Sequence, residues 1–595
     1  MKIKDFHSVL EKYCFPIFLI FSLICIILSI GNFDRALAIQ DKSTSGIFST
    51  NLILYPEIYK NDIISFVTNI GYLNPLVLTQ ALFKKTLNIN PYYLSYLFLV
   101  LGNLLFIIGF FKLTKYFTKE NFLSCLITLI SLGVVILDNN IANFGPGTSF
   151  QTFPDINFYA LGIICYLFFN LLKRNFIQAV FLVELLIFFH LGHALLILPI
   201  FYLTLISNLI FNCISLEYFL KILSVSLICI LTIFLIYFFN VSVSDIAVSN
   251  NHIFSFISGT VGGHIYPWEY EKYPNILINF FAVLLVFTFF YKKIKNLNSE
   301  FWILFFSISS LVCFYAISHF LILYFEIEEY IRFVQILPMR SSIYIQLLIF
   351  PVLIFYILNF LMTSKNKWQL SCLIIFFVLI GSHKSFASWI IFDLNYLKLS
   401  NFVLIKIISA ILIGIFFYFL YKKISDANVY FLPYFLTVIF SCFIFLESFN
   451  LFYGSNFSNK KDHELVQLLK WMNKETPSDS RFITIEYDIQ MNGLSNRSTY
   501  RPFPFIPEVY RVQDSQTERF SDFVLDFWKL EKLTERGWFD NFAKKEIYKK
   551  FSQINKNDIN YLAEISDSNF LISKAKDLDF EVVFFNETYF VYLIN

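Results

Sequence analysis

Runs of about twenty apolar residues recur along most of this chain, and they constrain its fold more than any other feature. A helix needs roughly 20 apolar residues to cross the hydrocarbon layer of a membrane. Such segments lie near residues 14–32, 94–116, 121–138, 156–173, 175–190, 192–211, 218–240, 275–293, 301–324, 340–361, 369–387, 402–421 and 429–450. The sequence therefore predicts an all-α membrane domain of about thirteen transmembrane helices.

One part of this pattern allows two interpretations. The stretch 175–211 is interrupted by His190-Leu191-Gly192-His193. It forms either two short spans or one span followed by a re-entrant piece.

A change in composition marks a second domain after residue 454. Only 15% of the 595 residues are charged, whereas soluble domains have about 25%. From residue 455 to the end the chain has 19 Lys and Arg and 22 Asp and Glu, nearly half of all its charged residues. We therefore expect a transmembrane domain over 1–454 and a soluble domain over 455–595.

The soluble domain is predicted to be a small α/β unit. Periodicity of 3.6 predicts helices near 462–473, 519–531, 538–553 and 557–566. Alternating or continuous apolar runs predict strands near 481–487, 570–573, 580–585 and 589–594. The aromatic and proline-rich stretch 497–511 is a candidate for folding back onto the membrane domain.

The placement of Lys and Arg predicts the orientation, because connections rich in these residues stay on the cytoplasmic side. The connection 139–155 has no Lys or Arg, and the connection 241–274 has one, Lys272. The alternate connections are short and basic, with Lys112, Lys115, Lys119, Lys173, Arg174, Lys221, Lys292, Lys293, Lys295, Lys365, Lys367, Lys422 and Lys423. We expect a cytoplasmic N-terminus and a soluble domain on the outer face. The net charge of +3 is too small to indicate a nucleic-acid partner.

The first outer loop, 33–93, holds the main candidates for catalysis. Asp34 directly follows the first span, Asp62 follows about thirty residues later, and Glu57 lies between them. Between Asp62 and residue 85 the chain has the pattern of an amphipathic segment at the membrane surface. A carboxylate there can deprotonate an acceptor hydroxyl. The alternative is that Asp34 only caps a helix end near water.

Further ionisable residues lie at or within the predicted spans, where such residues are candidates for function. His190 and His193 interrupt an apolar stretch, His264 lies in an outer loop, and Arg340 begins a span from the outer side. The alternative for the two histidines at the break is a hydrogen-bonded packing pair. Arg340 is a candidate for binding a phosphate. Other charges within spans are Glu184, Lys406 and Glu447.

Taken together, these features resemble the GT-C superfamily of membrane glycosyltransferases. The matching pieces are the acids after the first span, Tyr55-Pro56 with Asn61-Asp62, the span of His193, Gly263-His264 with Tyr266-Pro267, Arg340, and Trp471 with Glu475-Thr476-Pro477 and Arg501. The resemblance implies a polyprenyl-phosphate-linked sugar as donor, an outer glycan or lipid as acceptor, and a bacterial inner membrane as location.

The resemblance also implies roles for residues. Asp34 or Asp62 would be the catalytic base, and transfer would invert the sugar. Substrate-binding residues would be Glu57, His193, His264, Arg340 and Arg501. A divalent cation, Mg²⁺ or Mn²⁺, is an option that the scattered acids leave open, without a ligand pattern for it.

Protein N-glycosylation is not expected, because the chain has no tryptophan-tryptophan-aspartate motif. Two functions other than glycosyl transfer remain open. A transporter or flippase of a lipid-linked glycan would use the charges within spans, although the sequence has no internal repeat of the kind that many transporters have. The third possibility is a non-catalytic scaffold.

Overall fold

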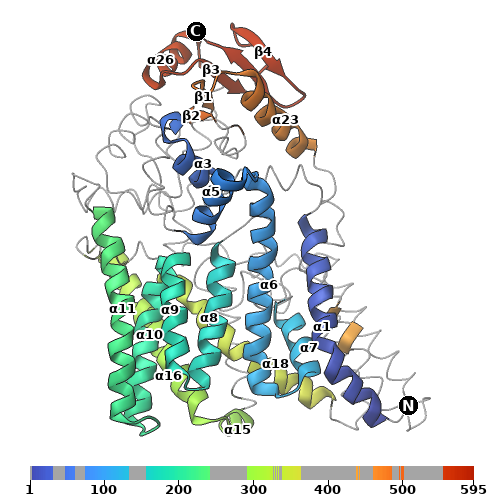
Figure 1. The fold of residues 1–595 in the computed structure, drawn as a ribbon, viewed down its shortest axis with the longest axis vertical. Helices are drawn as coiled ribbons and strands as arrows, with labels where there is room; N and C mark the ends of the chain where they lie inside the picture. Colours follow the sequence, from blue (N-terminus) through green and yellow to red (C-terminus); the bar gives the residue numbers. More distant parts are fainter. Residues whose placement is uncertain are drawn as a thin grey trace.

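The computed structural model describes residues 3–30, 47–59, 74–132, 156–241, 291–325, 338–362, 460–484, 497–500 and 554–594, with a few isolated positions between them. Within these residues, a body of long helices lies below a C-terminal domain that contains a sheet (Figure 1). We call the end of the body nearest to this domain the domain end. The N-terminus lies at the opposite end, which we call the basic end.

Long apolar helices form the body, as the sequence predicts. Within the described residues, helices lie at nine of the thirteen predicted spans: α1 (Ile3–Ile30), α6 (Pro91–Thr118), α7 (Asn121–Ile130), α8 (Ile156–Leu172), α9 (Phe176–Phe189), α10 (Leu191–Ile210), α11 (Leu216–Val241), α16 (Ser299–Tyr324) and α18 (Ser342–Met362). Six of these nine are long and apolar enough to cross a membrane. The predicted spans near 275–293, 369–387, 402–421 and 429–450 lie wholly or mostly outside the described residues.

Shorter elements connect these helices. At the domain end they are α3 (Ile47–Leu54), η1 (Pro56–Tyr59), α5 (Pro75–Leu87) and η6 (Pro338–Ser341), and at the basic end α15 (Tyr291–Ile294). The stretch 175–211 forms two helices, α9 and α10, that meet at His190. Of the two, α10 is long and apolar enough to cross a membrane, whereas α9 is a shorter apolar helix, so the choice between two spans and one span with a re-entrant piece stays a prediction.

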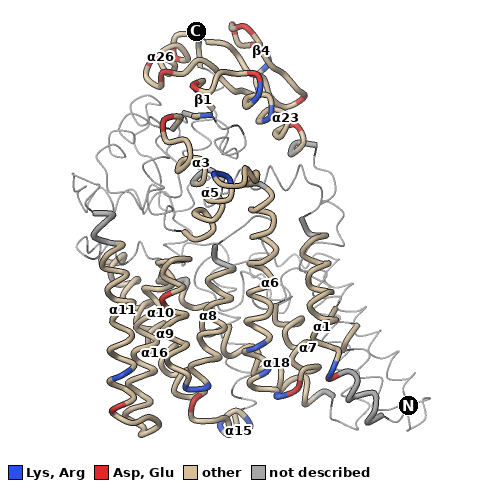
Figure 2. Tube along the Cα trace, in the orientation of Figure 1, with Lys and Arg blue, Asp and Glu red and all other residues tan. Residues whose placement is uncertain are grey.

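The basic residues of the body gather mainly at one end. Figure 2 shows them at the end of α6, at the α8–α9 joint, near the start of α11 and on α15, all opposite to the C-terminal domain. Lys84 and Lys85 of α5 are exceptions, because α5 lies at the domain end. The separation of short basic joints from the C-terminal domain is therefore present in the folded chain.

Two glycines let α6 and α8 pack at close range. A Cβ on Gly109 would lie 2.8 Å from the carbonyl oxygen of Gly162, which is backbone and cannot rotate away. A Cβ on Gly102, two turns earlier, would lie 2.7 Å from the ring of Tyr159. Small residues of this kind let membrane helices approach closely, where packing rather than hydrophobicity holds them together.

The C-terminal domain is an α/β unit with a five-stranded sheet between two helices. The sheet order is β2-β1-β3-β5-β4, parallel across β2-β1-β3 and antiparallel across β3-β5-β4. Its elements are α23 (Lys460–Glu475), β1 (Arg481–Thr484), β2 (Ser498–Tyr500), α26 (Lys556–Ser566), β3 (Phe570–Ser573), β4 (Glu581–Phe585) and β5 (Phe590–Leu593).

Alternation along the strands explains the two helical layers, because successive strand residues point to opposite faces. Phe482, Ile572 and Val591 pack against the apolar face of α23. Ile483, Leu571 and Tyr592 follow or precede them by one residue and pack against α26. The predicted helices near 519–531 and 538–553 lie outside the described residues.

The start of the stretch 497–511 forms part of this sheet, although its sequence pattern does not predict a strand. Its first residues make β2, paired with β1. Arg497 is 4% exposed, and its guanidinium donates to the carbonyl oxygens of Asn473 and Thr476 at the end of α23. The remainder of the stretch lies outside the described residues, so its predicted return to the membrane domain stays a prediction.

We predict that Gly109→Ala lowers the thermal unfolding midpoint of the detergent-solubilised chain. The added methyl group would force α6 and α8 apart, and overpacking of this kind costs about 1–3 kcal/mol. Leu101, on the same helix, is 45% exposed. Leu101→Ala is therefore the control and should change the midpoint little. Equal midpoints for the wild type and Gly109→Ala would contradict the proposed close contact.

Candidate functional site

A buried polar chain fixes part of the first outer loop on the domain end of the body. The Thr50 hydroxyl of α3 donates to Gln80 Oε1 of α5 at 2.7 Å, and Gln80 Nε2 donates to the Ser95 hydroxyl of α6 at 2.8 Å. All three residues are buried. Asn74 caps α5 through the Leu76 amide, so the Asn74-Pro75 break is a helix start. The segment that carries Glu57 is thus attached to α6.

Tyr159 of α8 continues this packing toward α9. Its hydroxyl donates to the Phe98 carbonyl of α6, and its ring stacks on Phe189 at 5.2 Å between centroids. Leu76 of α5 packs in the same cluster. Because Phe189 directly precedes His190, this contact connects the outer-loop helices to the break between α9 and α10.

His190 and His193 form a hydrogen-bonded pair at that break. His190 Nδ1 accepts from the His193 amide at 3.2 Å, so His190 is the N-cap of α10. The two rings lie 4.4 Å apart between centroids. The packing pair that the sequence allowed as an alternative is therefore present, and it also gives His193 a defined position.

Tyr344 of α18 is the partner of His193. Its hydroxyl lies 2.6 Å from His193 Nδ1, and both side chains are buried. Tyr344 follows Arg340 by four residues, and Arg340 lies on η6, which packs against α16 and α10. The structure thus brings the His193 segment and the Arg340 segment together, although 147 positions separate them in the sequence.

The other predicted site residues divide into one that is described and several that are not. Glu57 lies on η1 and is exposed. Asp34, Asp62, His264 and Arg501 lie outside the described residues, as do Lys406 and Glu447. Their assignment to one site stays a prediction.

The Trp471 and Glu475-Thr476-Pro477 motif has a structural role in the described residues. Trp471 stacks on Phe584 at 5.0 Å and packs edge-on to Phe570. The Thr476 hydroxyl accepts from Arg497 Nε at 3.1 Å, which ties the end of α23 to β2.

Two buried residues at the domain end were not predicted from the sequence. Tyr344 looks like one more aromatic residue in an apolar span, and only its distant partner distinguishes it. His319 of α16 is fully buried, one turn after Tyr315, whose hydroxyl donates to the Leu196 carbonyl of α10. A histidine in an apolar span was the signal that could have found His319.

Glu184 lies within the body, apart from the group of residues at the domain end. Its Oε1 accepts from the Thr232 hydroxyl of α11 at 2.7 Å, so the carboxyl group links α9 to α11. Its Oε2 is buried and has no hydrogen-bond partner among the described residues. Of the four residues that the transport alternative would use, Glu184 and His190 are described, whereas Lys406 and Glu447 are not.

Within the described ranges, three or more His, Cys, Asp or Glu side chains do not come together as a metal site. The candidate acids Asp34 and Asp62 lie outside these ranges. A divalent cation at those acids therefore remains an untested option.

We predict that Tyr344→Phe lowers the thermal unfolding midpoint by the loss of one buried hydrogen bond, about 1 kcal/mol. The phenylalanine ring keeps the packing, so the change isolates the hydroxyl. Tyr356→Phe on the same helix is the control, since its hydroxyl donates to the Lys293 carbonyl at 3.3 Å in an exposed place. A loss for Tyr344→Phe no larger than for Tyr356→Phe would contradict a structural role for the His193–Tyr344 bond.

Comparisons with known proteins return similar structures only. Neither a protein-family model nor a curated protein matches the sequence. The chain is similar to ArnT from Cupriavidus metallidurans bound to undecaprenyl phosphate, at 10% identity and a TM-score of 0.45, over 98% of both chains. It is also similar to the archaeal oligosaccharyltransferase AglB from Archaeoglobus fulgidus in complex with an inhibitory peptide and a dolichol-phosphate, at 9% identity and a TM-score of 0.37. That match covers 95% of this chain and 70% of AglB.

Both similar structures share 10% or less of their residues with this chain. Because their TM-scores are below 0.5, they carry no weight for the function, and the proposal below rests on the residues of this chain.

Proposed function

We propose that this chain is a multi-pass membrane glycosyltransferase that moves a sugar from a polyprenyl phosphate to a glycan or lipid acceptor. The chain would reside in a bacterial inner membrane, and its C-terminal domain would lie outside the cytoplasm. The convergence of the His193 and Arg340 segments at the domain end is the observation that carries this proposal.

The geometry of that end supports the binding of an anion. α10 begins next to His190 and α18 begins next to Arg340, and both helices start at the domain end. The N-terminus of a helix carries a partial positive charge and favours phosphate. Arg340 adds a full positive charge on η6, at the start of α18.

The proposed reaction needs a base and a leaving group. The acceptor hydroxyl attacks the anomeric carbon, and its proton passes to the carboxylate of Asp34 or Asp62. The bond between that carbon and the phosphate oxygen breaks, and the polyprenyl phosphate leaves with the electron pair. Arg340 and His264 would stabilise the charge that develops on the phosphate, which is usually a large contribution to catalysis. Glu57, His193 and Arg501 would hold the sugar and the acceptor.

His193 suits a positioning role in this scheme. Tyr344 and the α10 backbone hold its ring, so the side chain does not have to be ordered when substrate binds. Preorganised groups of this kind lower the cost of reaching the transition state.

Transport of a lipid-linked glycan is the alternative that the described residues also allow. The carboxyl group of Glu184, with Oε2 buried, is the observation in its favour. Against it, the Thr232 bond gives Glu184 a structural role between α9 and α11.

We predict that liposomes with the full-length chain release undecaprenyl phosphate from at least one undecaprenyl-phosphate-linked pentose or hexose, when a bacterial envelope-glycan extract supplies acceptors. Asp34→Asn or Asp62→Asn should lower the release rate about 100-fold or more, the contribution expected of a general base. Glu217→Gln is the control, since Glu217 is an exposed carboxylate near the basic end and should leave the rate unchanged.

Movement of the lipid-linked sugar across the bilayer without release of undecaprenyl phosphate would overturn the transferase. The transport alternative would gain support if Glu184→Gln then lowered that movement and Asp34→Asn did not.

A further inference from the structure

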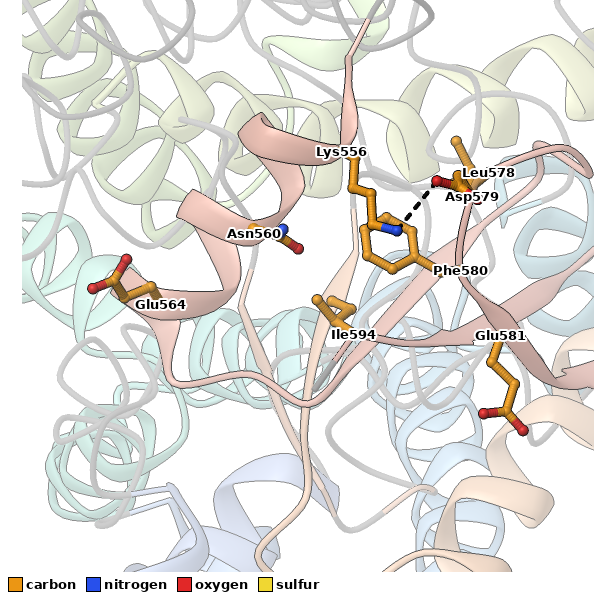
Figure 3. A pocket seen from close by; sticks show the side chains of 8 residues that line it. All are labelled: Lys556, Asn560, Glu564, Leu578, Asp579, Phe580, Glu581 and Ile594. Atoms are coloured by element: carbon orange, nitrogen blue, oxygen red, sulfur yellow. Dashed lines mark hydrogen bonds and ion pairs between the residues drawn. The ribbon is translucent and has the colours of Figure 1, made fainter.

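The hollow between α26 and residues 578–581 in the C-terminal domain is an open surface (Figure 3). The carboxylate groups of Glu564 and Glu581 point away from its centre. The Lys556 ammonium group is already paired with Asp579 at 3.2 Å. Its charged groups therefore do not converge on one ligand. A surface on α5, at the domain end of the body, is different, because an apolar and a basic part lie together on one helix face.

The outer face of α5 has apolar side chains where a helix in contact with water would have polar ones. The polar side chain of Gln80 is turned inward and is 1% exposed, through its bonds to Thr50 and Ser95. Leu78 and Leu82, by contrast, are 45% and 58% exposed. The outer face of α5 therefore suits an apolar surrounding.

The position of α5 supplies that surrounding. α5 lies beside the domain end of α6 (Figure 1), and its Leu76 packs in one cluster with Leu94 and Phe98 of α6. The part of α6 that is apolar enough to cross a membrane begins at Tyr93. At a rise of 1.5 Å per residue, these contacts lie within roughly 8 Å of the start of the span. Amphipathic helices at this depth bury their apolar face at the boundary between head groups and acyl chains.

Lys85 adds a positive charge to the exposed face of α5. It follows Leu78 by seven residues and Leu82 by three, so the three side chains share one side of the helix. Lys85 is exposed, and among the described residues its ammonium group forms no ion pair. A lysine at a membrane surface packs its methylene stem on apolar chains and extends its ammonium group to the polar layer. Two leucines and an ammonium group on one face match a lipid with an anionic head group.

A role for these lysines within the protein explains only part of this arrangement. Lys84 Nζ donates to the side chain of Asn88 at 2.8 Å, and Asn88 caps the end of α5 with a φ of 53°. Lysines in the last turn also interact favourably with the helix dipole. Neither effect requires Lys85 to share its face with exposed leucines. Most basic residues of the body gather at the opposite end (Figure 2), so a lysine at the domain end indicates an anionic partner there.

We propose that the exposed face of α5 binds an anionic phospholipid of the bilayer leaflet at the domain end. The acyl chains pack on Leu78 and Leu82, and the Lys85 ammonium group pairs with the head-group phosphate. In a zwitterionic phospholipid the choline cation offsets the phosphate charge, so a lipid with net negative charge binds better. None of the residues assigned to sugar transfer lies on this face, and the inference does not depend on the proposed function.

The test measures which lipid lies next to residue 82. Leu82→Cys, in a background without the native cysteines, is labelled with the apolar fluorophore bimane. The full-length chain is reconstituted singly into phosphatidylcholine nanodiscs. A minor fraction of the lipid is either phosphatidylglycerol or phosphatidylcholine with brominated acyl chains, and bromine quenches the fluorophore only at close contact.

We expect brominated phosphatidylglycerol to quench as if enriched about fivefold over brominated phosphatidylcholine, the effect of one lysine near anionic head groups. Lys85→Gln should lower this enrichment to below about twofold, because it removes that charge. Lys474→Gln is the matched control and should leave the enrichment unchanged. Lys474 is also an exposed lysine in the last turn of a helix, but it lies on α23 in the C-terminal domain.

A second measurement needs no label and keeps the native cysteines. Phosphatidylglycerol, compared with phosphatidylcholine, should raise the thermal unfolding midpoint of the wild type more than that of Lys85→Gln. The basic residues at the opposite end of the body are the same in both chains, so the difference reports on Lys85.

Five outcomes overturn the proposal. Absence of quenching by either brominated lipid means that lipid does not cover this face. Equal quenching by both lipids, or an enrichment that Lys85→Gln leaves unchanged, means contact with lipid without a head-group site. Loss of the enrichment on addition of glycerol phosphate means a site for free phosphate. Displacement of phosphatidylglycerol by a much smaller amount of undecaprenyl phosphate means that this face belongs to the donor site.

Discussion

Between α6 and α8 the two backbones approach closely at Gly109 and Gly162, and the side chains beyond this contact take their positions from it. Gly102 extends the contact toward the domain end, where the Tyr159 ring occupies the space that a Cβ would fill. Tyr159 then bonds Phe98 and stacks on Phe189, one residue before His190. The place of the α9–α10 break, and so of His193, depends on how closely these helices pack.

Much of the membrane domain could be predicted because the lipid imposes a local rule. A segment that crosses hydrocarbon must satisfy its own backbone as a helix, so apolar length alone predicted the helices. The break at His190 was equally local, since a polar and glycine-containing tetrapeptide interrupts an apolar run. The three final strands were predicted within one residue at each boundary because their composition and turn are local too.

The parts that could not be predicted depend on distant partners. Tyr344 is 151 residues from His193, and an aromatic residue in an apolar span gives no sign of such a bond. Ser498–Tyr500 is a three-residue strand at the sheet edge, too short for alternation to be visible. Its neighbour Arg497 was not singled out, because its role depends on the carbonyls at the end of α23. For the candidate site, residue type selected His193 and Arg340, but only the fold brings their segments together.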